Sequence, residues 1–410
     1  MPTVFPDLDR LPSAAPTPLV QVGHFGEGGD NRLVHGDNLG VLAGLPERTV
    51  QAVYIDPPYN TGTDFQHYTD ARSRRDWLAF MAERLVVIRR LLHPSGSLFV
   101  QVDDNEVDYL KVLLDDIFGA DALVSRITVR ARAPSAFSTV NRGVFKASEY
   151  LLWVARDRSQ LQWFPQRVPR APDPAYTRWI DNPDDPPEQW RLASVRDRYK
   201  ARSGVKSVRR DDPAYQRFIL DHSRQVFRFT AISDKKAGAA TVALKRRSRE
   251  EPQRVFVLDR GPELEPVIVC NGQQITTYDR NVTTLDGVRT ASTPLTNIWT
   301  DLRWEGIASE GGVRFKQGKK PERLIRRVLQ LSTRPGDHVL DCFGGSGTTA
   351  AVAHKMKRRW TLIEKGPQAL THARPRLQRV VDGQDASGVS VLEDWTGGGG
   401  FSVCVPREAP

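Results

Sequence analysis

The chain has 410 residues and a mass of 46.0 kDa, enough for one large domain with a second or inserted one. Its net charge of +10 favours a polyanionic partner, most commonly nucleic acid. Cys270, Cys342 and Cys404 are few and far apart, so we predict neither a disulfide framework nor a metal site. No apolar run could span a bilayer, and we predict a cytoplasmic protein without a membrane partner.

The first elements lead to an abrupt strand end. Residues 1–30 are predicted to form an irregular arm, 32–37 a short strand and 38–45 the start of a helix. The strand Val53-Tyr54-Ile55 stops at Asp56-Pro57-Pro58-Tyr59, because proline cannot donate to a sheet ladder. A carboxylate and an aromatic ring therefore stand at the carboxyl end of a strand, where open α/β sheets bind ligands. The simpler alternative is a Pro-Pro turn with a capping aspartate.

Strands and helices alternate over the following residues. The polar loop 60–70 is a candidate substrate-facing lid. Apolar spacing predicts a helix over 77–92, a strand over 97–102 and a helix over 107–118, with a further strand at 150–154. This alternation predicts an α/β fold with a doubly wound, mostly parallel sheet.

A different pattern begins after about residue 155. Proline is frequent over 164–188, arginine and lysine over 191–210, and short alternating apolar runs over 226–278. We therefore predict an inserted, β-leaning domain. Because its basic charge is concentrated outside the α/β pattern, binding of a polyanion is favoured over a merely solvated face.

The α/β pattern returns near residue 320. A helix over 321–331 precedes a buried strand that ends at Asp341, and the glycine-rich turn 342–349 opens a helix. The next strand, 359–364, ends in an acid, and the tail 396–410 contains a glycine run that predicts flexibility.

The glycine-rich turn indicates a nucleotide-like ligand. A strand, a tight glycine turn and a helix amino end let the backbone approach a ligand closely. Gly345-x-Gly347-x-x-Ala350 with Glu364 downstream fits the dinucleotide fingerprint, which leaves a nicotinamide cofactor and S-adenosyl-L-methionine both open. A glycine turn that only packs helix on strand is the alternative. The two motifs make sense together if the loop at Asp56 holds an amino group and the glycine-rich turn holds a methyl donor.

At these residues the chain resembles the beta-class DNA amino-methyltransferases that use S-adenosyl-L-methionine, in the circularly permuted order in which the catalytic motif comes first. It is most similar to adenine-N6 enzymes of the kind found as type III restriction-modification methylation subunits. The resemblance covers about Leu33 to Glu364. The matching stretches are His35–Leu39, Ile55–Gly62, Phe99–Val107, Glu149-Tyr150, Asn182–Pro186, Gly318–Glu322 and Leu340–Thr349.

The resemblance implies a Rossmann-like methyltransferase fold in two halves around an insertion. It divides the chain into the arm 1–30, a catalytic half 31–160, a target-recognition insertion 161–305, a cofactor-binding half 306–395 and the flexible tail 396–410. Base-reading residues are expected between about 126 and 300.

The resemblance also implies roles for named residues. The catalytic tetrapeptide would be Asp56, Pro57, Pro58 and Tyr59. Within it, the carboxylate of Asp56 and the carbonyl of Pro57 would accept hydrogen bonds from a target amino group, and Tyr59 would stack on a flipped base. Glu364 would bind the ribose, Asp37 and Asn38 would lie near the adenine end, and Lys320 would bind the methionine carboxylate. The rest of the cofactor would be lined by Asp341, Phe343, Gly344, Gly345, Ser346, Gly347 and Thr348.

The implied activity is methylation of adenine N6 in double-stranded DNA, with a homodimer and a restriction subunit as further partners and the nucleoid as the place of action. Cytosine N4 shares the mechanism, although in the family Asp at the position of Asp56 favours adenine. Methylation at cytosine C5 is disfavoured because no cysteine follows a proline. The competing hypotheses are a nicotinamide oxidoreductase, a non-catalytic DNA-binding protein, and a methyltransferase that acts on RNA or on a protein amide.

Overall fold

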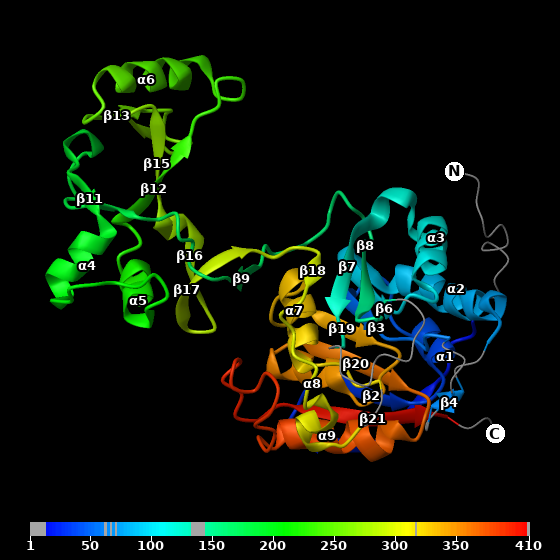
Figure 1. The fold of residues 1–410 in the computed structure, drawn as a ribbon. Helices are drawn as coiled ribbons and strands as arrows, with labels where there is room; N and C mark the ends of the chain where they lie inside the picture. Colours follow the sequence, from blue (N-terminus) through cyan, green and yellow to red (C-terminus); the bar gives the residue numbers. More distant parts are fainter. Residues whose placement is uncertain are drawn as a thin grey trace. The chain divides into compact units, whose positions relative to one another are not determined.

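The computed structural model describes residues 14–60, 72–132, 144–315 and 318–407, and the backbone of two short strands, β4 (Asp64–Phe65) and β5 (Tyr68–Thr69). The chain divides into two compact units (Figure 1). Unit 1 comprises Met1–Pro165 and Thr296–Pro410, and unit 2 comprises Gln166–Leu295. The lid predicted over residues 60–70 falls almost wholly outside the described residues.

Unit 1 is built on one mixed sheet. Its strands follow the order β1-β21-β2-β20-β19-β3-β6-β8-β7-β18. The strands from β21 to β6 run parallel to one another, whereas β1, β8 and β7 each pair antiparallel with a neighbour. The strands are β1 (Leu19–Gly26), β2 (Asn31–His35), β3 (Val50–Ile55), β6 (Leu92–Val102), β7 (Leu123–Arg130), β8 (Ser148–Ala155), β18 (Ile298–Trp299), β19 (His338–Asp341), β20 (Arg359–Glu364) and β21 (Gly400–Pro406).

The helices form two groups. Through α1, α2 and α3 the chain passes from β2 to β3, then to β6 and then to β7, in one direction across the sheet. Through α7, α8 and α9 it passes from β18 to β19, then to β20 and then to β21, in the opposite direction. Right-handed crossovers in opposite directions place the groups on opposite faces, so the sheet is doubly wound as predicted. The helices are α1 (Asn38–Ala43), α2 (Arg74–Leu91), α3 (Val107–Phe118), α7 (Glu322–Ser332), α8 (Thr348–Lys355) and α9 (Arg374–Val381).

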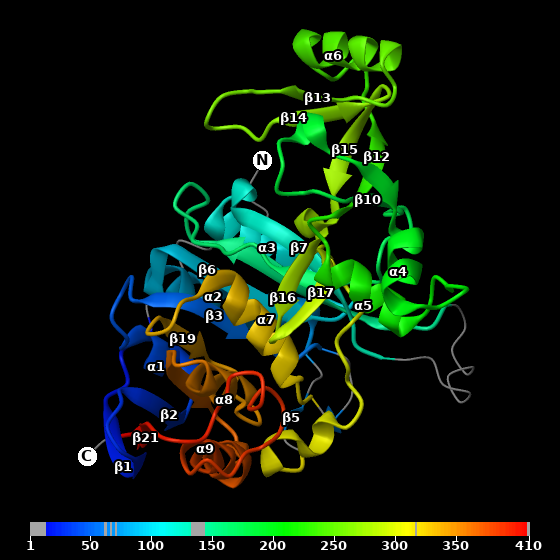
Figure 2. The ribbon, with the colours of Figure 1, turned by 90° about the vertical axis from the view of Figure 1, so that its left-hand side faces the viewer.

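The winding direction changes between β3 and β19, which are neighbours in the sheet. Figure 2 shows β3 between β6 and β19. Leu340 on β19 is paired with Val53 on β3, so both strands end at the same edge. The crevice outside such a switch point is where doubly wound sheets bind their ligands.

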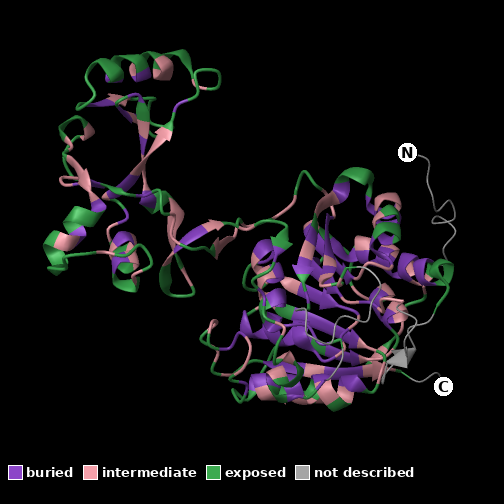
Figure 3. Cartoon of the chain, in the orientation of Figure 1, coloured by how far each residue is buried: buried purple, intermediate pink, exposed green. Residues whose placement is uncertain are grey.

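Burial explains why β3 forms at the centre. All six of its residues are buried, as expected for a parallel strand covered on both faces (Figure 3). On one face the core includes Trp77, Met81 and Leu85, which recur at helical spacing along α2. The ladder ends at Asp56, where Pro57 and Pro58 have no N–H to donate.

Both ends of the described chain differ from the prediction. β1 lies within the arm predicted over 1–30, and β21 lies within the tail predicted to be flexible over 396–410. The strands pair with each other, and β21 also pairs parallel with β2. The tail is ordered because its glycines make a turn, with a φ of 110° at Gly397, and the next residues alternate, burying Phe401 and Val403 in the sheet.

Unit 2 combines two small sheets with three α-helices in its described residues. One sheet has the order β11-β10-β12-β15-β14-β13 and the other β16-β17-β9. Its core includes Tyr176, Trp179, Val195, Val226 and Tyr278. The elements are β9 (Arg167–Pro169), β10 (Arg178–Ile180), β11 (Leu192–Ser194), α4 (Val195–Ser203), α5 (Pro213–Asp221), β12 (Val226–Ala231), α6 (Ala239–Glu250), β13 (Val255–Leu258), β14 (Val267–Cys270), β15 (Gln273–Thr277), β16 (Val282–Leu285) and β17 (Val288–Pro294).

Unit 2 differs from the predicted insertion in two respects. Helices α4, α5 and α6 make it a mixed α and β unit rather than only β-leaning. The unit is also shorter than 161–305, because β18 pairs with β7 of unit 1 and the N–H of Phe164 donates to the carbonyl of Leu331.

Candidate active site

Acidic side chains follow five neighbouring strands of the parallel part of the sheet. In sheet order β2, β20, β19, β3 and β6, these residues are Asp37, Glu364, Asp341, Asp56 and Asp103. The alignment follows from the topology, since parallel strands all present their carboxyl ends at one edge. The two sequence-predicted sites, centred on Asp56 and Asp341, are therefore side by side across the switch point.

Asp56 is the centre of a compact polar group. The hydroxyl of Tyr59 lies 2.7 Å from Oδ1 of Asp56 and 3.0 Å from Oε2 of Glu149. The Nζ of Lys320 lies 2.6 Å from Oδ2 of Asp56 and 3.8 Å from Oε2 of Glu149. Because one hydroxyl has a single proton, Tyr59 donates to only one of the two carboxylates at a time. We name Asp56, Tyr59, Glu149 and Lys320 the Asp56 group.

A buried relay behind the Asp56 group holds Glu149 in place. The amide of Gln101 donates to Oε2 of Glu149 at 2.6 Å, and the hydroxyl of Tyr54 donates to the amide oxygen of Gln101, also at 2.6 Å. Since β8 is antiparallel to β6, the start of β8 reaches the same edge at which β6 ends, and Glu149 comes opposite Asp103. Glu149 can therefore join a site built from strand ends.

The charged side chains of Asp56 and Lys320 stabilise each other in a buried site. Burial raises the pKa of Asp56, and the ammonium of Lys320 acts against that rise. Burial disfavours the charged form of Lys320, but Asp56 and Glu149 outweigh it and raise the pKa of the ammonium. Burial and the nearby carboxylates raise the pKa of Tyr59 well above its usual value. Lys320 is thus kept as an ammonium beside Asp56, and Tyr59 is kept as a protonated phenol.

A hydrogen bond from α2 holds the loop Asp56-Pro57-Pro58-Tyr59 in place. The indole N–H of Trp77 donates to the carbonyl of Pro58 at 2.7 Å. No hydrogen bond from a described residue reaches the carbonyl of Pro57. That carbonyl remains able to accept a hydrogen bond beside Asp56.

In the glycine-rich turn after β19, Gly344 and Gly347 pack against neighbouring residues, whereas Gly345 faces open space. A Cβ at Gly344 would come within 2.8 Å of Leu362, so this glycine lets the turn pack on β20. At Gly345, with a φ of 50°, the nearest atom to an added Cβ would be 3.9 Å away. The backbone at Gly345 therefore lines a space that the protein does not fill.

Glu364 faces this turn from β20. Its Oε2 accepts the N–H of Gly345 at 2.7 Å, and its Oε1 accepts the N–H of Gly366 and the amide of Gln368. Burial raises the pKa of Glu364, and these backbone N–H groups act against the rise. Oε2 has one described donor and can accept another, as a ribose hydroxyl would require.

Asp341 lies between the two predicted sites and is almost wholly buried. Burial raises its pKa to about 7, opposed by hydrogen bonds from Thr349 and from the N–H of Phe343. The charges of Asp56 and Glu364 raise it further. A carboxyl in this state binds a cation with loss of its proton.

Other predicted cofactor residues are used by the protein itself. Asn38 donates to the carbonyl of Cys342 at 2.7 Å and accepts from Arg84 at 2.8 Å, which ties α1 to the glycine-rich turn. Asp37 caps α1 through the N–H of Leu39 and binds Lys365. These side chains position the turn from the side of β2.

Ser346 and Thr348 point inward to a buried arginine. Nη1 of Arg376 lies 2.7 Å from Oγ1 of Thr348 and 3.3 Å from Oγ of Ser346. Its Nη2 binds Oε1 of Glu322 at 2.8 Å, and Glu322 also binds Lys355. Only the backbone of this part of the turn is available to a ligand.

Four site residues were not predicted as such. Glu149 and Gln101 complete the Asp56 group, and Arg376 and Glu322 support the glycine-rich turn. Lys320 was predicted near the methionine carboxylate, but its contacts are with Asp56 and Glu149. Among the described residues, no cluster of His, Cys, Asp and Glu could hold a metal ion, and no helix is long and apolar enough to cross a bilayer.

The family comparison agrees with this architecture. Residues 50–375 match the family model described as DNA methylase. The match includes the Asp56 group, unit 2 and the glycine-rich turn. The chain belongs to the DNA methylase family.

Individual relatives are similar to the chain over most of its length. It is 30% identical to the "Probable type III restriction-modification enzyme HindVI Mod subunit" of Haemophilus influenzae, over 91% of this chain and 53% of the relative. It is 24% identical to the type III restriction-modification enzyme EcoPI Mod subunit of Escherichia phage P1, over 79% of this chain and 55% of that relative. The chain thus spans about half the length of these two relatives.

Among solved structures, the chain was compared with the PvuII DNA methyltransferase (cytosine-N4-specific). It shares 14% identity with a TM-score of 0.43, over 92% of this chain and 95% of that one.

Proposed function

We propose that the chain transfers a methyl group from S-adenosyl-L-methionine to N6 of adenine in double-stranded DNA. The observation that carries the proposal is the position of the Asp56 group beside the glycine-rich turn, on neighbouring parallel strands at the switch point. Family membership and the similarity to type III Mod subunits support the same activity.

The chemistry requires the target nitrogen to be made nucleophilic. Its lone pair is delocalised into the purine, and acceptors for both N–H bonds draw the nitrogen toward tetrahedral geometry. Oδ2 of Asp56 and the carbonyl of Pro57 are those acceptors in this proposal. As the N–C bond forms and the S–C bond breaks, the nitrogen loses one proton to Asp56 or to water.

The ammonium of Lys320 occupies the position on Asp56 that the target amine requires. Both are nitrogen donors to a carboxylate, and Lys320 can shift toward Glu149, which already lies 3.8 Å away. The proposal therefore includes an exchange of one donor for another at Oδ2. The ring of Tyr59 provides the stacking face for a base rotated out of the duplex.

The residues at the glycine-rich turn fit the methyl donor. The open space at Gly345 admits close backbone approach, and Oε2 of Glu364 has capacity for a ribose hydroxyl. Asp341 offers a buried carboxyl to the cationic part of the molecule. When bound there, S-adenosyl-L-methionine supplies an electrophilic methyl group.

Methylation of isolated DNA tests the proposal and separates it from its main alternative. The purified chain is incubated with labelled S-adenosyl-L-methionine and genomic DNA, and the digested nucleosides are analysed by mass spectrometry. We expect N6-methyladenine. N4-methylcytosine would establish the cytosine alternative, which shares the mechanism, and no transfer to DNA would reject both.

The same assay tests the role of Asp56. Asp56→Asn should lower the rate by at least about 100-fold, since the amide offers one acceptor and no charge. Asp108→Asn, which changes an exposed residue on α3 paired with Arg126, is the matched control and should retain full activity. Full activity of Asp56→Asn would contradict the mechanism.

Several further assignments belong to this proposal. Unit 2 would serve as the target-recognition domain, with base-reading residues between about 126 and 300. A homodimer and a restriction subunit are further partners. The substrate places the protein in the cytoplasm, at the nucleoid. Light scattering and DNA footprinting of the purified chain test the dimer and the recognition domain.

A further inference from the structure

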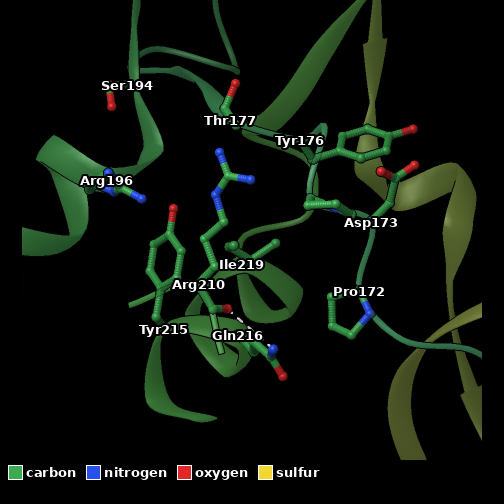
Figure 4. Close-up of a pocket in the computed structure, with 11 residues that line it drawn as sticks. Pro172, Asp173, Tyr176, Thr177, Ser194, Arg196, Arg210, Tyr215, Gln216 and Ile219 are labelled. Atoms are coloured by element: carbon green, nitrogen blue, oxygen red, sulfur yellow. Dashed lines mark hydrogen bonds between the residues drawn. The ribbon is translucent and has the colours of Figure 1, made fainter. Parts of the chain in front are cut away.

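A pocket in unit 2 has the composition of an anion site. Its volume is about 230 Å³, and it lies between the segment before β10, the start of α4 and the start of α5. Figure 4 shows the guanidinium groups of Arg196 and Arg210 and the hydroxyl of Tyr215 directed into it. We name it the Arg210 pocket; its other polar edges include Ser194 and Thr177.

The two arginines carry charge that the protein does not neutralise. Both are exposed, and neither forms an ion pair with a described residue. Arg209, the neighbour of Arg210, is by contrast paired with both carboxylate oxygens of Asp211 at 3.2 and 3.0 Å. The one acid that lines the pocket, Asp173, binds Arg228 at 3.1 Å. The pocket therefore has a surplus of positive charge.

Tyr215 provides an unused donor at the wall of the pocket. Only 6% of the residue is exposed, because its ring packs against Tyr199 at a centroid distance of 5.1 Å. Within the described part of the chain its hydroxyl has no hydrogen-bond partner. Burial raises the pKa of this phenol, although Arg196 and Arg210 act against the rise, so the hydroxyl keeps its proton. The hydroxyl lines the pocket and is therefore available to a ligand that accepts its hydrogen bond.

The backbone strengthens the preference for a negative ligand. Ser194 is the N-cap of α4, whose nine residues begin at the pocket. The N–H of Val195 already donates to the carbonyl of Thr177 and that of Asp197 to Oγ of Ser194, so this helix end favours an anion mainly through the helix dipole. The loop that carries Arg210 is also fixed, because the amide of Gln216 donates to the carbonyl of Arg210 at 3.2 Å.

We propose that the Arg210 pocket binds a backbone phosphate of duplex DNA. Two guanidinium groups and a hydroxyl donor match the oxygens of a phosphodiester, and the apolar side chain of Ile219 at the same pocket suits the adjoining sugar. The inference rests on the proposed function, because it assumes a DNA substrate. It assigns the pocket to positioning, since phosphate contacts carry no sequence information.

Salt-dependent DNA binding tests the pocket without knowledge of the recognition sequence. Fluorescence anisotropy of a labelled duplex is measured over a range of salt concentrations for the full chain and its variants. Arg196→Gln and Arg210→Gln should each weaken binding about tenfold and reduce the slope of log K against log salt by about 0.9. Arg209→Gln removes the same formal charge outside the pocket and should change binding less than about twofold.

Tyr215→Phe provides a second, fold-preserving variant. It removes the hydroxyl and keeps the ring that packs against Tyr199. Affinity should fall about threefold with the salt slope unchanged, because no charge is lost. Thermal melting of each variant checks that unit 2 remains folded.

Equal effects of Arg210→Gln and Arg209→Gln would overturn the proposal, because the arginines would then act only as diffuse charge. Binding of deoxyadenosine monophosphate that depends on Arg210, with duplex binding unaffected, would overturn it in favour of a free-nucleotide site. If the unmodified chain neither binds nor methylates DNA, the proposed function fails and this inference with it. If it does both while Arg210→Gln behaves like Arg209→Gln, only the pocket assignment fails.

Discussion

The ammonium of Lys320 lies 2.6 Å from the carboxylate of Asp56, although the two residues are 264 positions apart in the sequence. The contact joins the loop before α7 to the end of β3 and lies within unit 1. It means that the proposed acceptor for the target amine is neutralised by a residue from the other half of the fold. Several measurable properties of the protein depend on this pairing.

Replacement of Lys320 by methionine should shift the pH profile of methyl transfer. The ammonium lowers the pKa of Asp56, so its removal raises that pKa and the charged carboxylate forms only at higher pH. The acid limb of the kcat profile should therefore move to higher pH, and activity at pH 6 should fall more than activity at pH 8. Lys320→Arg, which keeps the charge, is the control. An unshifted acid limb in Lys320→Met would contradict the assigned pairing.

Binding of S-adenosyl-L-methionine should depend on pH through Asp341. The pKa of this carboxyl is raised to about 7 by burial, and a cationic ligand favours its deprotonated form. The affinity measured by calorimetry should weaken by up to about tenfold per pH unit below pH 7. Asp341→Asn should bind more weakly and lose this dependence. Affinity that is constant from pH 5.5 to 8 in the unmodified chain would reject the role.

The same residue should affect the stability of the ligand-free protein in the opposite sense. Between its unfolded pKa near 4 and its folded pKa of about 7, Asp341 binds more protons when the protein is folded. The free energy of unfolding should therefore decrease as the pH rises through this window. Urea titrations at pH 5 and 7 should show a smaller decrease in Asp341→Asn than in the unmodified chain.

The buried charges under the glycine-rich turn should be important for stability. Glu322 binds Lys355 and Arg376, and all three side chains are fully buried. Glu322→Gln removes the carboxylate that pairs with Arg376 and leaves Lys355 with Asp385 alone, and it should destabilise the protein by about 3–5 kcal/mol in urea unfolding. Asp301→Asn breaks the more exposed pair with Arg327 and should cost less than about 1 kcal/mol. Equal effects of the two changes would contradict this account.

Two substitutions of Tyr59 should separate its hydroxyl from its ring. Tyr59→Phe removes the hydrogen bond to Asp56 or Glu149 and should lower kcat about tenfold while base flipping persists. Tyr59→Ala removes the stacking face as well and should reduce the flipping signal of a 2-aminopurine probe in the duplex. A normal signal from Tyr59→Ala would exclude stacking as the role of the ring.

The loop that begins at Asp56 and the glycine-rich turn could be predicted because their signals are local. A buried apolar run that ends in Asp-Pro-Pro or in a glycine-rich turn identifies both a strand and the edge at which it ends. The adjacency of Asp56 and Asp341 followed from the doubly wound order. Glu149 could not be placed in this way, because its position depends on β8 running antiparallel to its neighbour.

Other differences have equally physical causes. α4 is rich in charge and buries little more than Val195 and Tyr199, so its sequence has no strong apolar stripe. The glycine run before β21 predicts a flexible segment, because composition does not distinguish a spacer from a turn. The pairing of Lys320 with Asp56 could not be predicted from local sequence, because it depends on how the two halves of unit 1 pack together.

The position of β21 has a consequence for how the sheet of unit 1 is completed during synthesis. Among the described strands of this sheet, β21 emerges last from the ribosome, yet its place is between β1 and β2, which emerge first. Until it arrives, β1 has no strand to pair with and one side of β2 stays open to other chains. A chain truncated before Gly400 should therefore aggregate during expression, even though the proposed catalytic residues are all present.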